Sequence, residues 1–180
     1  MNLDEKIISA LKDLDYKEAT EIQKKAIPIA LKKRDILAAA QSGTGKTAAF
    51  LLPILTELIA NKQPNKPVLR TLILVPTREL ASQISKAAED LGKYLDVQKL
   101  AVFGGVSTKE QEKKIAKGLD ILVATSGRLM EHLKNGTVDL SSVTTVVIDE
   151  VDTMLDMGFW EDIEILLPSV GPKRQIMMFS

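Results

Sequence analysis

The sequence predicts an α/β protein built on a doubly wound parallel sheet with helices on both faces. Short apolar segments alternate with helical segments along the chain. Most of the short segments are apolar on both faces, which is typical of parallel strands covered on both sides. Polar residues follow directly after several of these strands, at the sheet edge where α/β proteins bind ligands. A chain of 180 residues suits one domain with its own core.

Two helices are expected before the first strand. Apolar residues recur at helical spacing from Leu3 to Leu14, which predicts an amphipathic helix. A second helix is expected over residues 20–32, with Thr20 as its N-cap and Pro28 as a local kink.

The rest of the chain is expected to alternate between strand and helix. Residues 61–67 form the one obvious loop. We expect it to lie on the surface of the domain, because it is too short to link two domains. The expected strands cover residues 36–40, 71–75, 99–103, 121–124, 145–148 and 175–179, and the expected helices cover residues 46–60, 78–91, 109–117, 127–134 and 160–167.

Composition excludes several classes of function. The 24 basic and 24 acidic residues balance, so any binding of nucleic acid must come from local groups. The chain has no Cys and therefore no disulfide framework. Its single histidine, His132, rules out a His-based metal cluster and is expected on a helix surface. The N-terminus lacks a signal-peptide pattern, and no apolar run reaches membrane-spanning length, which favours a cytoplasmic, monomeric protein with no membrane segment.

The segment over residues 40–47, AQSGTGKT, lies between an expected strand and an expected helix. A Gly-rich turn in this position makes a phosphate cradle, because backbone N–H groups and the helix N-terminus converge on an anion. Lys46 can reach the β- and γ-phosphates, and the Thr47 hydroxyl can ligate Mg²⁺. Ala40 stands where this pattern usually has Gly. The expected nucleotide-binding residues of this segment are Gln41, Ser42, Gly43, Thr44, Gly45, Lys46 and Thr47.

An acidic segment, Asp149-Glu150-Val151-Asp152, follows the expected strand over residues 145–148. Asp149 would hold Mg²⁺ largely through water. Glu150 would act as general base toward an attacking water or orient it, so the expected catalytic residues are Lys46, Asp149 and Glu150. Asp152 could couple the site to another element. The alternative is an acidic helix start, which the helix dipole favours.

These two segments together resemble the first RecA-like domain of a DEAD-box RNA helicase. Further matches occur in that family's order and cover nearly the whole chain. Residues 16–23 resemble the adenine-reading Q motif, residues 76–80 motif Ia, Gly104 and Gly105 the GG element, residues 125–128 motif Ib, and residues 178–180 the entry to motif III.

The resemblance implies a RecA-like P-loop domain over residues 1–180, with ATP and Mg²⁺ as cofactors. It implies that Gln23 reads adenine and that Tyr16 stacks on the base, although both could be ordinary surface residues. It also implies coupling to a second domain through Asp152 and Ser180. The implied RNA-backbone contacts, each of which could instead be a solvated side chain or a plain turn, are Pro76, Thr77, Arg78, Gly104, Gly105, Thr125, Gly127 and Arg128.

Five departures from the family pattern stand out. Val151 replaces Ala in the acidic segment, and Ser126 replaces Pro in motif Ib. In the Q motif, Asp15 replaces Gly and Ala19 replaces Pro. The family's upstream aromatic residue would fall before Met1.

The function implied is the ATP-binding core of an RNA-stimulated ATPase that unwinds short RNA duplexes. The family's second RecA-like domain is not in these residues, so we expect this chain alone to bind nucleotide but to hydrolyse ATP poorly. Two alternatives stay open. One is a P-loop ATPase that acts on DNA or protein, and the other is a nucleotide-gated RNA-binding clamp.

Overall fold

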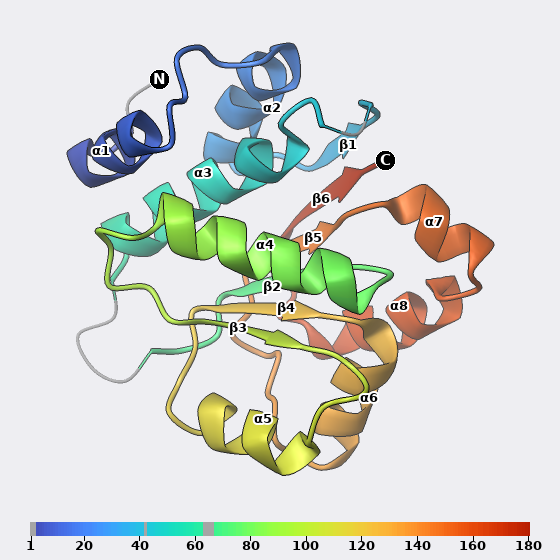
Figure 1. The fold of residues 1–180 in the computed structure, drawn as a ribbon. Helices are drawn as coiled ribbons and strands as arrows, with labels where there is room; N and C mark the ends of the chain where they lie inside the picture. The colour runs from blue at the N-terminus through green and yellow to red at the C-terminus, as the bar shows by residue number, and fades with distance from the viewer. Residues whose placement is uncertain (1–2, 42, 63–66) are drawn as a thin grey trace.

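The computed structural model describes residues 3–41, 43–62 and 67–180. Among these residues, six strands form one parallel sheet in the order β1-β6-β5-β2-β4-β3 (Figure 1). The strands are β1 (Ile36–Ala38), β2 (Thr71–Leu74), β3 (Lys99–Val102), β4 (Ile121–Ala124), β5 (Thr145–Ile148) and β6 (Gln175–Phe179).

Helices connect the strands and cover both faces of the sheet (Figure 1). In chain order they are α1 (Glu5–Asp13), α2 (Glu21–Leu31), α3 (Lys46–Ala60), α4 (Arg78–Leu91), α5 (Thr108–Ile115), α6 (Ser126–Lys134), α7 (Val151–Asp156) and α8 (Trp160–Leu166), followed by the 3₁₀ turn η1 (Leu167–Ser169).

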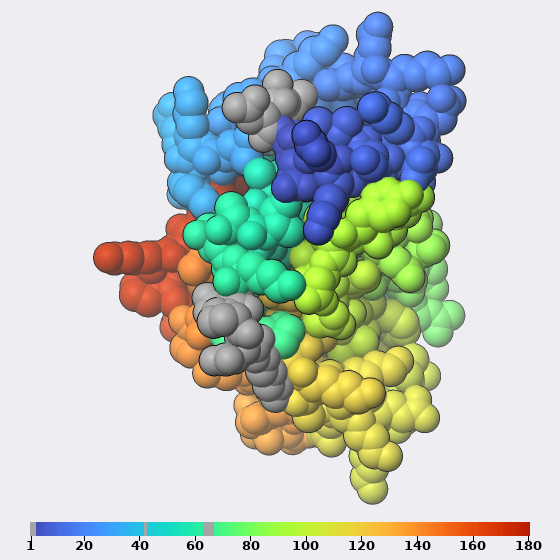
Figure 2. Space-filling view, turned by 90° about the vertical axis from the view of Figure 1, so that its left-hand side faces the viewer, coloured from blue at the N-terminus to red at the C-terminus, as the bar shows by residue number. Residues whose placement is uncertain are grey.

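The sheet separates two apolar cores. Helices α1 to α4 pack on one face, where the rings of Phe50 and Phe179 lie 5.4 Å apart between centroids. Helices α6, α7 and α8 contribute to the core on the other face. Neighbouring residues of β4 face opposite ways, because Val123 belongs to the first core and Leu122 to the second. Figure 2 shows the α1 segment against the end of α4, with α5 toward the opposite end of the molecule.

Strand register places the sequence motifs side by side. Leu74 of β2 pairs with Ala124 of β4 and with Ile148 of β5, so the segments after these three strands emerge at one sheet edge. Ala40 N donates to Ser180 O over 3.0 Å, which holds the residues after β1 beside the end of β6. The carboxyl edge therefore gathers the residues expected to bind ligands.

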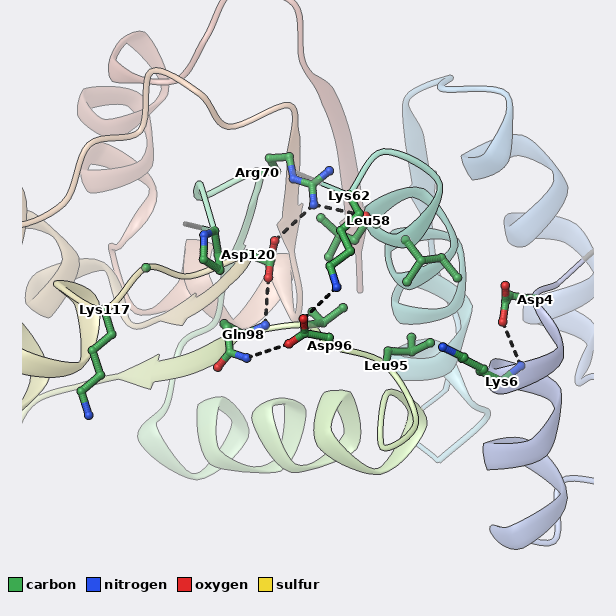
Figure 3. Close-up of a pocket in the computed structure, with 14 residues that line it drawn as sticks. Asp4, Lys6, Leu58, Lys62, Arg70, Leu95, Asp96, Gln98, Lys117 and Asp120 are labelled. Carbon is green, nitrogen blue, oxygen red and sulfur yellow. Dashed lines mark hydrogen bonds and ion pairs between the residues drawn. The ribbon is translucent and has the colours of Figure 1, made fainter. Parts of the chain in front are cut away.

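The opposite, amino-terminal edge is held by a buried ion pair (Figure 3). Arg70 Nη2 lies 3.2 Å from Asp120 Oδ1, and Asp120 Oδ2 accepts a hydrogen bond from Gln98 N over 2.9 Å. A cavity of about 520 Å³ lies here, far from the phosphate loop in the fold, and its Lys62 and Asp96 side chains pair with each other. We assign this edge a structural role.

The predicted elements are all present, with shifted ends. Strands β1, β2 and β3 stop at Ala38, Leu74 and Val102, short of the predicted residues 40, 75 and 103. Helix α5 covers Thr108–Ile115 rather than residues 109–117. Helix α7 was not predicted as a separate element. Of the predicted loop over residues 61–67, residues 63–66 lie outside the described part of the chain. No helix among the described residues combines the length and apolarity needed to span a bilayer.

The prediction that His132 lies on a helix surface was wrong. His132 is 0% exposed, and its Nε2 lies 2.9 Å from Gln111 Oε1. His132 and Leu129 are one helical turn apart on the buried face of α6, so the position belongs to the core pattern of that helix. The imidazole is buried there because a hydrogen-bond partner from α5 accompanies it.

Candidate nucleotide and RNA site

The phosphate loop between β1 and α3 has the backbone shape of an anion cradle. Gly43 and Gly45 have φ values of 79° and 92°, in the left-handed region where residues with a Cβ are strained. Thr44 closes the turn, because its hydroxyl donates to Gln41 O over 2.6 Å. Left-handed glycines on either side of Thr44, directly before a helix, turn backbone N–H groups toward one point, which fits a phosphate group. Ser42, also predicted to bind nucleotide, lies outside the described residues.

The Gln23 side chain is hydrogen-bonded to this loop. Its Nε2 donates to Gly45 O over 3.1 Å, and its Oε1 accepts from Thr20 N over 3.0 Å. Gln23 is only 3% exposed, so the alternative of an ordinary surface glutamine is wrong. A Cβ on Gly45 would lie 2.4 Å from Gln23 Nε2, and so the contact requires glycine. An amide has two N–H groups and two acceptor sites, which leaves capacity to contact a base.

Tyr16 and Gln23 line one small pocket at the start of α2. Tyr16 is 45% exposed and available for stacking. Asp15 has a φ of 57°, which explains why Gly is usual at this position in the family. Asp tolerates the left-handed region better than most residues, so the departure at residue 15 keeps the turn.

The phosphate loop and the acidic segment share one cavity. It measures about 560 Å³, and its lining includes Gln41 and Lys46 from the loop side, Glu150 and Asp152 after β5, and Ser180 after β6. Chain segments more than a hundred residues apart thus converge where a triphosphate would lie beside the loop. Thr47 follows Lys46 in the first turn of α3.

Asp149 is 3% exposed, and this burial raises the pKa of its carboxyl group. Glu150 N donates to Asp149 Oδ1 over 3.0 Å, and this bond and the charge of Lys46 act in the opposite direction on the pKa. Carboxylate oxygens are ligands that suit a hard cation such as Mg²⁺. Within the described residues, no three His, Cys, Asp or Glu side chains gather as a preformed metal cage. Mg²⁺ would therefore keep water or phosphate oxygens among its ligands, as it commonly does.

Glu150 has a strained backbone, with a φ of 52° and a ψ of 50°. Non-glycine residues in this region cost of order 1–3 kcal/mol and cluster at functional sites. Its side chain makes no capping hydrogen bond to α7, although the acidic residues do lie at the start of that helix, as the alternative interpretation expected. The carboxylate instead borders the cavity that Lys46 lines.

Asp152 and Ser180 are joined directly. A hydrogen bond from the Ser180 side chain is the main cause that lowers the pKa of the Asp152 carboxyl group. This contact links the segment after β5 to the end of β6, while the coupling of these two residues to a second domain stays a prediction.

A second group of predicted residues lies farther along the same edge, after β2, β4 and β3. Thr77 caps α4, since its hydroxyl accepts a hydrogen bond from Leu80 N over 3.2 Å. Arg78 is exposed and pairs with Glu79. Gly105 has a φ of 82°, and a Cβ there would lie 3.8 Å from Arg78 Nη1. The structure therefore brings the segment after Pro76 and the Gly104–Gly105 turn together.

Arg128 differs from the free phosphate-binding side chain that was expected. Its side chain is 10% exposed, and Nε pairs with Glu131. Its Nη1 donates to Val106 O and to Gln111 Oε1, both over 2.9 Å. Sequence reasoning missed Gln111, although its spacing to Ile115 on α5 indicates a position on the inner face.

Motif Ib carries a contact of its own in this chain. Thr125 is the N-cap residue of α6, and Ser126 and Gly127 form its first turn. The Ser126 hydroxyl donates to Asp162 Oδ2 over 2.7 Å and ties α6 to α8, a bond that proline could not make.

The fold and the site define a P-loop α/β domain, with a cavity beside the loop that suits a nucleoside triphosphate. Comparison with known proteins identifies the family within this class. Residues 20–180 match the family model described as DEAD/DEAH box helicase. The chain belongs to that family, and its all-parallel sheet has a RecA-like fold.

Relatives with assigned names agree with this family. The ATP-dependent RNA helicase SrmB of Escherichia coli is 42% identical over 180 residues, which is 100% of this chain and 40% of that protein. The ATP-dependent RNA helicase CshA of Listeria monocytogenes is 43% identical over 99% of this chain and 34% of that protein. The chain thus spans less than half the length of these relatives.

A solved structure confirms the fold. The hypothetical ATP-dependent RNA helicase from Sulfolobus tokodaii is 40% identical, with a TM-score of 0.88. The match covers 100% of this chain and 50% of that one.

Proposed function

We propose that this chain is the ATP-binding core domain of an ATP-dependent RNA helicase, an RNA-stimulated ATPase that opens short RNA duplexes. The observation that supports it best is the cavity shared by Lys46, Glu150, Asp152 and Ser180, next to an edge that presents Arg78 and the Gly104–Gly105 turn. A triphosphate site and a polar surface for a nucleic-acid backbone thus lie on one sheet edge.

Each residue at the nucleotide site has a role that follows from its position. The N–H groups of residues 43–47 and the Lys46 ammonium bind phosphate oxygens. Thr47 and Asp149 hold Mg²⁺, and Gln23 and Tyr16 contact the adenine ring. Bound Mg²⁺ and ATP supply the charge neutralisation and the reactive phosphoryl group. The Glu150 carboxylate orients the attacking water and accepts its proton.

RNA would be held through its backbone. Residues 76–78, the Gly104–Gly105 turn and residues 125–127 offer N–H groups, hydroxyls and the Arg78 guanidinium at strand ends and helix starts. Such groups contact phosphate and sugar, so binding should depend little on base sequence.

The relatives are longer than this chain, and we propose that a second RecA-like domain completes the site in the intact protein. In this proposal the second domain supplies arginine side chains to the phosphates and half of the RNA surface. An arginine finger is worth about 10³–10⁵ in rate, so the 180-residue chain alone should bind ATP but turn it over slowly.

The test is ATP hydrolysis by the intact protein with and without single-stranded RNA, with Glu150→Gln as the control. We expect RNA to stimulate hydrolysis more than DNA of the same sequence, and the control to bind ATP without turnover. Equal stimulation by DNA would favour the alternative P-loop ATPase. Nucleotide-dependent RNA binding with full cellular function of the Glu150→Gln protein would favour the clamp.

A further inference from the structure

Gln111 is a buried polar residue at the centre of a hydrogen-bond network on the proposed RNA side. It is 4% exposed although it lies on the short, mostly polar helix α5. Its Nε2 donates to Phe103 O over 3.2 Å. Its Oε1 accepts from Arg128 Nη1 and lies 2.9 Å from His132 Nε2. One side chain therefore joins the end of β3 to helix α6.

The network holds both ends of the Gly104–Gly105 turn. Phe103 directly precedes the two glycines, and its carbonyl accepts from Gln111. Val106 directly follows them, and its carbonyl accepts from Arg128 Nη1 over 2.9 Å. Because Arg128 and Gln111 also bond to each other, the two ends of the turn are fixed relative to one another.

The tip of the turn has few supports of its own. A Cβ on Gly104 would meet nothing within 4 Å, and one on Gly105 would meet only Arg78 within that distance. Gly105 adopts a φ of 82°, which only a few residue types tolerate. The conformation of the turn therefore depends on how residues 103 and 106 are held.

The chemistry of the network allows one orientation of the Gln111 amide. The NH₂ group must face the Phe103 carbonyl, and the oxygen must face the Arg128 guanidinium, which only donates. The oxygen then accepts from His132 Nε2, which places the imidazole proton on that nitrogen. Among the described residues, buried His132 Nδ1 has no hydrogen-bond partner, and it is the unprotonated nitrogen in this tautomer.

We propose that Gln111 is a positioning residue for RNA binding, and that Arg128 acts with it by holding the turn rather than by contacting phosphate. This inference rests on the proposed RNA-helicase function. Loss of the amide would release the turn and misplace the backbone N–H groups that face RNA. The nucleotide cavity is lined by residues that follow other strands, namely β1, β5 and β6, so nucleotide binding should be unaffected.

The test compares Gln111→Met with Gln83→Met in the intact protein. Met matches glutamine in length but cannot hydrogen bond, and Gln83 is an exposed residue of α4 that serves as the matched control. Fluorescence anisotropy with labelled single-stranded RNA, in the presence of Mg²⁺ and a non-hydrolysable ATP analogue, measures affinity. We expect Gln111→Met to weaken RNA binding about tenfold or more, while affinity for a fluorescent nucleotide without RNA stays the same.

Hydrogen exchange provides a readout that general destabilisation would not give. Backbone amides of residues 104–107 should exchange faster in Gln111→Met, whereas amides of β2 and β4 should not change. If Gln111→Met fails to fold, Arg128→Lys applies the same test, since a lysine cannot contact Val106 O and Gln111 as the guanidinium fork does.

The outcomes separate this inference from the proposed function. Wild-type protein that does not bind RNA would refute the function itself. RNA binding by the wild type, with equal affinity in Gln111→Met and unchanged exchange at residues 104–107, would overturn the role of Gln111. Loss of nucleotide and RNA binding together would also overturn it, because that result indicates a purely structural residue.

Discussion

The side-chain amide of Gln23 donates a hydrogen bond to the carbonyl oxygen of Gly45 over 3.1 Å, and no side chain at residue 45 leaves room for it. The contact joins the segment that we propose reads the base to the phosphate loop. We expect Gly45→Ala to abolish measurable ATP binding, because the new methyl group would displace Gln23 and strain a backbone with a φ of 92°. Isothermal titration calorimetry with Mg²⁺ and ATP measures this.

Gly136→Ala is the control for backbone strain. Gly136 has a φ of 66°, and a Cβ there would meet nothing within 4 Å. It should lower the melting temperature without changing ATP affinity. If Gly45→Ala binds ATP as well as the wild type, the fit between Gln23 and the loop has no role in nucleotide binding.

Adenine selectivity provides a second test of Gln23. We expect Gln23→Ala to reduce the preference for ATP over GTP, because the amide that braces the loop, and that we propose reads the base, is lost. Competition binding with both nucleotides gives the ratio. An unchanged ratio would limit Gln23 to bracing the loop.

Lys46→Ala should remove nucleotide binding without unfolding the chain. Lys46 lines the same cavity as Glu150, and its charge is one cause that opposes the raised pKa of Asp149. Unchanged ATP affinity by calorimetry, in a variant whose circular dichroism matches the wild type, would show that the phosphate loop is assigned wrongly.

His132 should make stability depend on pH in a definite direction. Burial, followed by the nearby Arg128, lowers the pKa of its imidazole from 6.5, while Glu112 and Glu131 act in the opposite direction. In the unfolded chain the His132 imidazole therefore binds a proton near pH 6.5, whereas in the folded chain it binds this proton only at a lower pH. The free energy of unfolding should fall as the pH drops below about 6.5, by at most about 1.4 kcal/mol per pH unit.

The chain has one histidine, so this effect can be isolated. Urea unfolding between pH 7.5 and 5 should show that the free energy of unfolding falls more steeply with decreasing pH for the wild type than for His132→Leu. This comparison holds whatever the absolute stability of the variant. Parallel curves for the two proteins would show that His132 titrates alike in the folded and unfolded states.

The ion pair between Arg70 and Asp120 should contribute strongly to stability (Figure 3). Their side chains are 12% and 9% exposed, so Asp120→Asn leaves a guanidinium buried without its counter-charge. Removing one partner of a buried pair costs about 3–5 kcal/mol. Guanidinium chloride unfolding measures the loss. Asp96→Asn, which breaks an exposed pair with Lys62, should have no measurable effect.

Sequence patterns predicted the fold well because its central strands are buried on both faces. Strands β2, β4 and β5 are buried throughout, and an apolar run between polar turns reports this directly. Strand ends were less predictable, since Val75 and Phe103 are apolar but lie just past the last ladder residue. Apolar character marks burial, whereas a strand end is set by hydrogen bonding.

The site was predictable where a residue acts through its own position in a motif. Lys46, Glu150 and Asp152 border one cavity as their spacing after strands implied. Gln111 was missed and His132 was misjudged for the same reason. A polar side chain is predicted to be solvated unless its buried hydrogen-bond partner is known. Here the side-chain partners of Gln111 lie on a different helix, α6.

The division of the core by the sheet bears on how such a sequence can change over evolutionary time. Leu122 and Val123 are adjacent in β4, yet their neighbours are different sets of helices. A larger side chain at residue 122 can be accommodated by changes in α6, α7 or α8, and one at residue 123 by changes in α1 to α4. Successive residues of a central strand should therefore covary with different sets of helices, because those helices pack on opposite faces of the sheet.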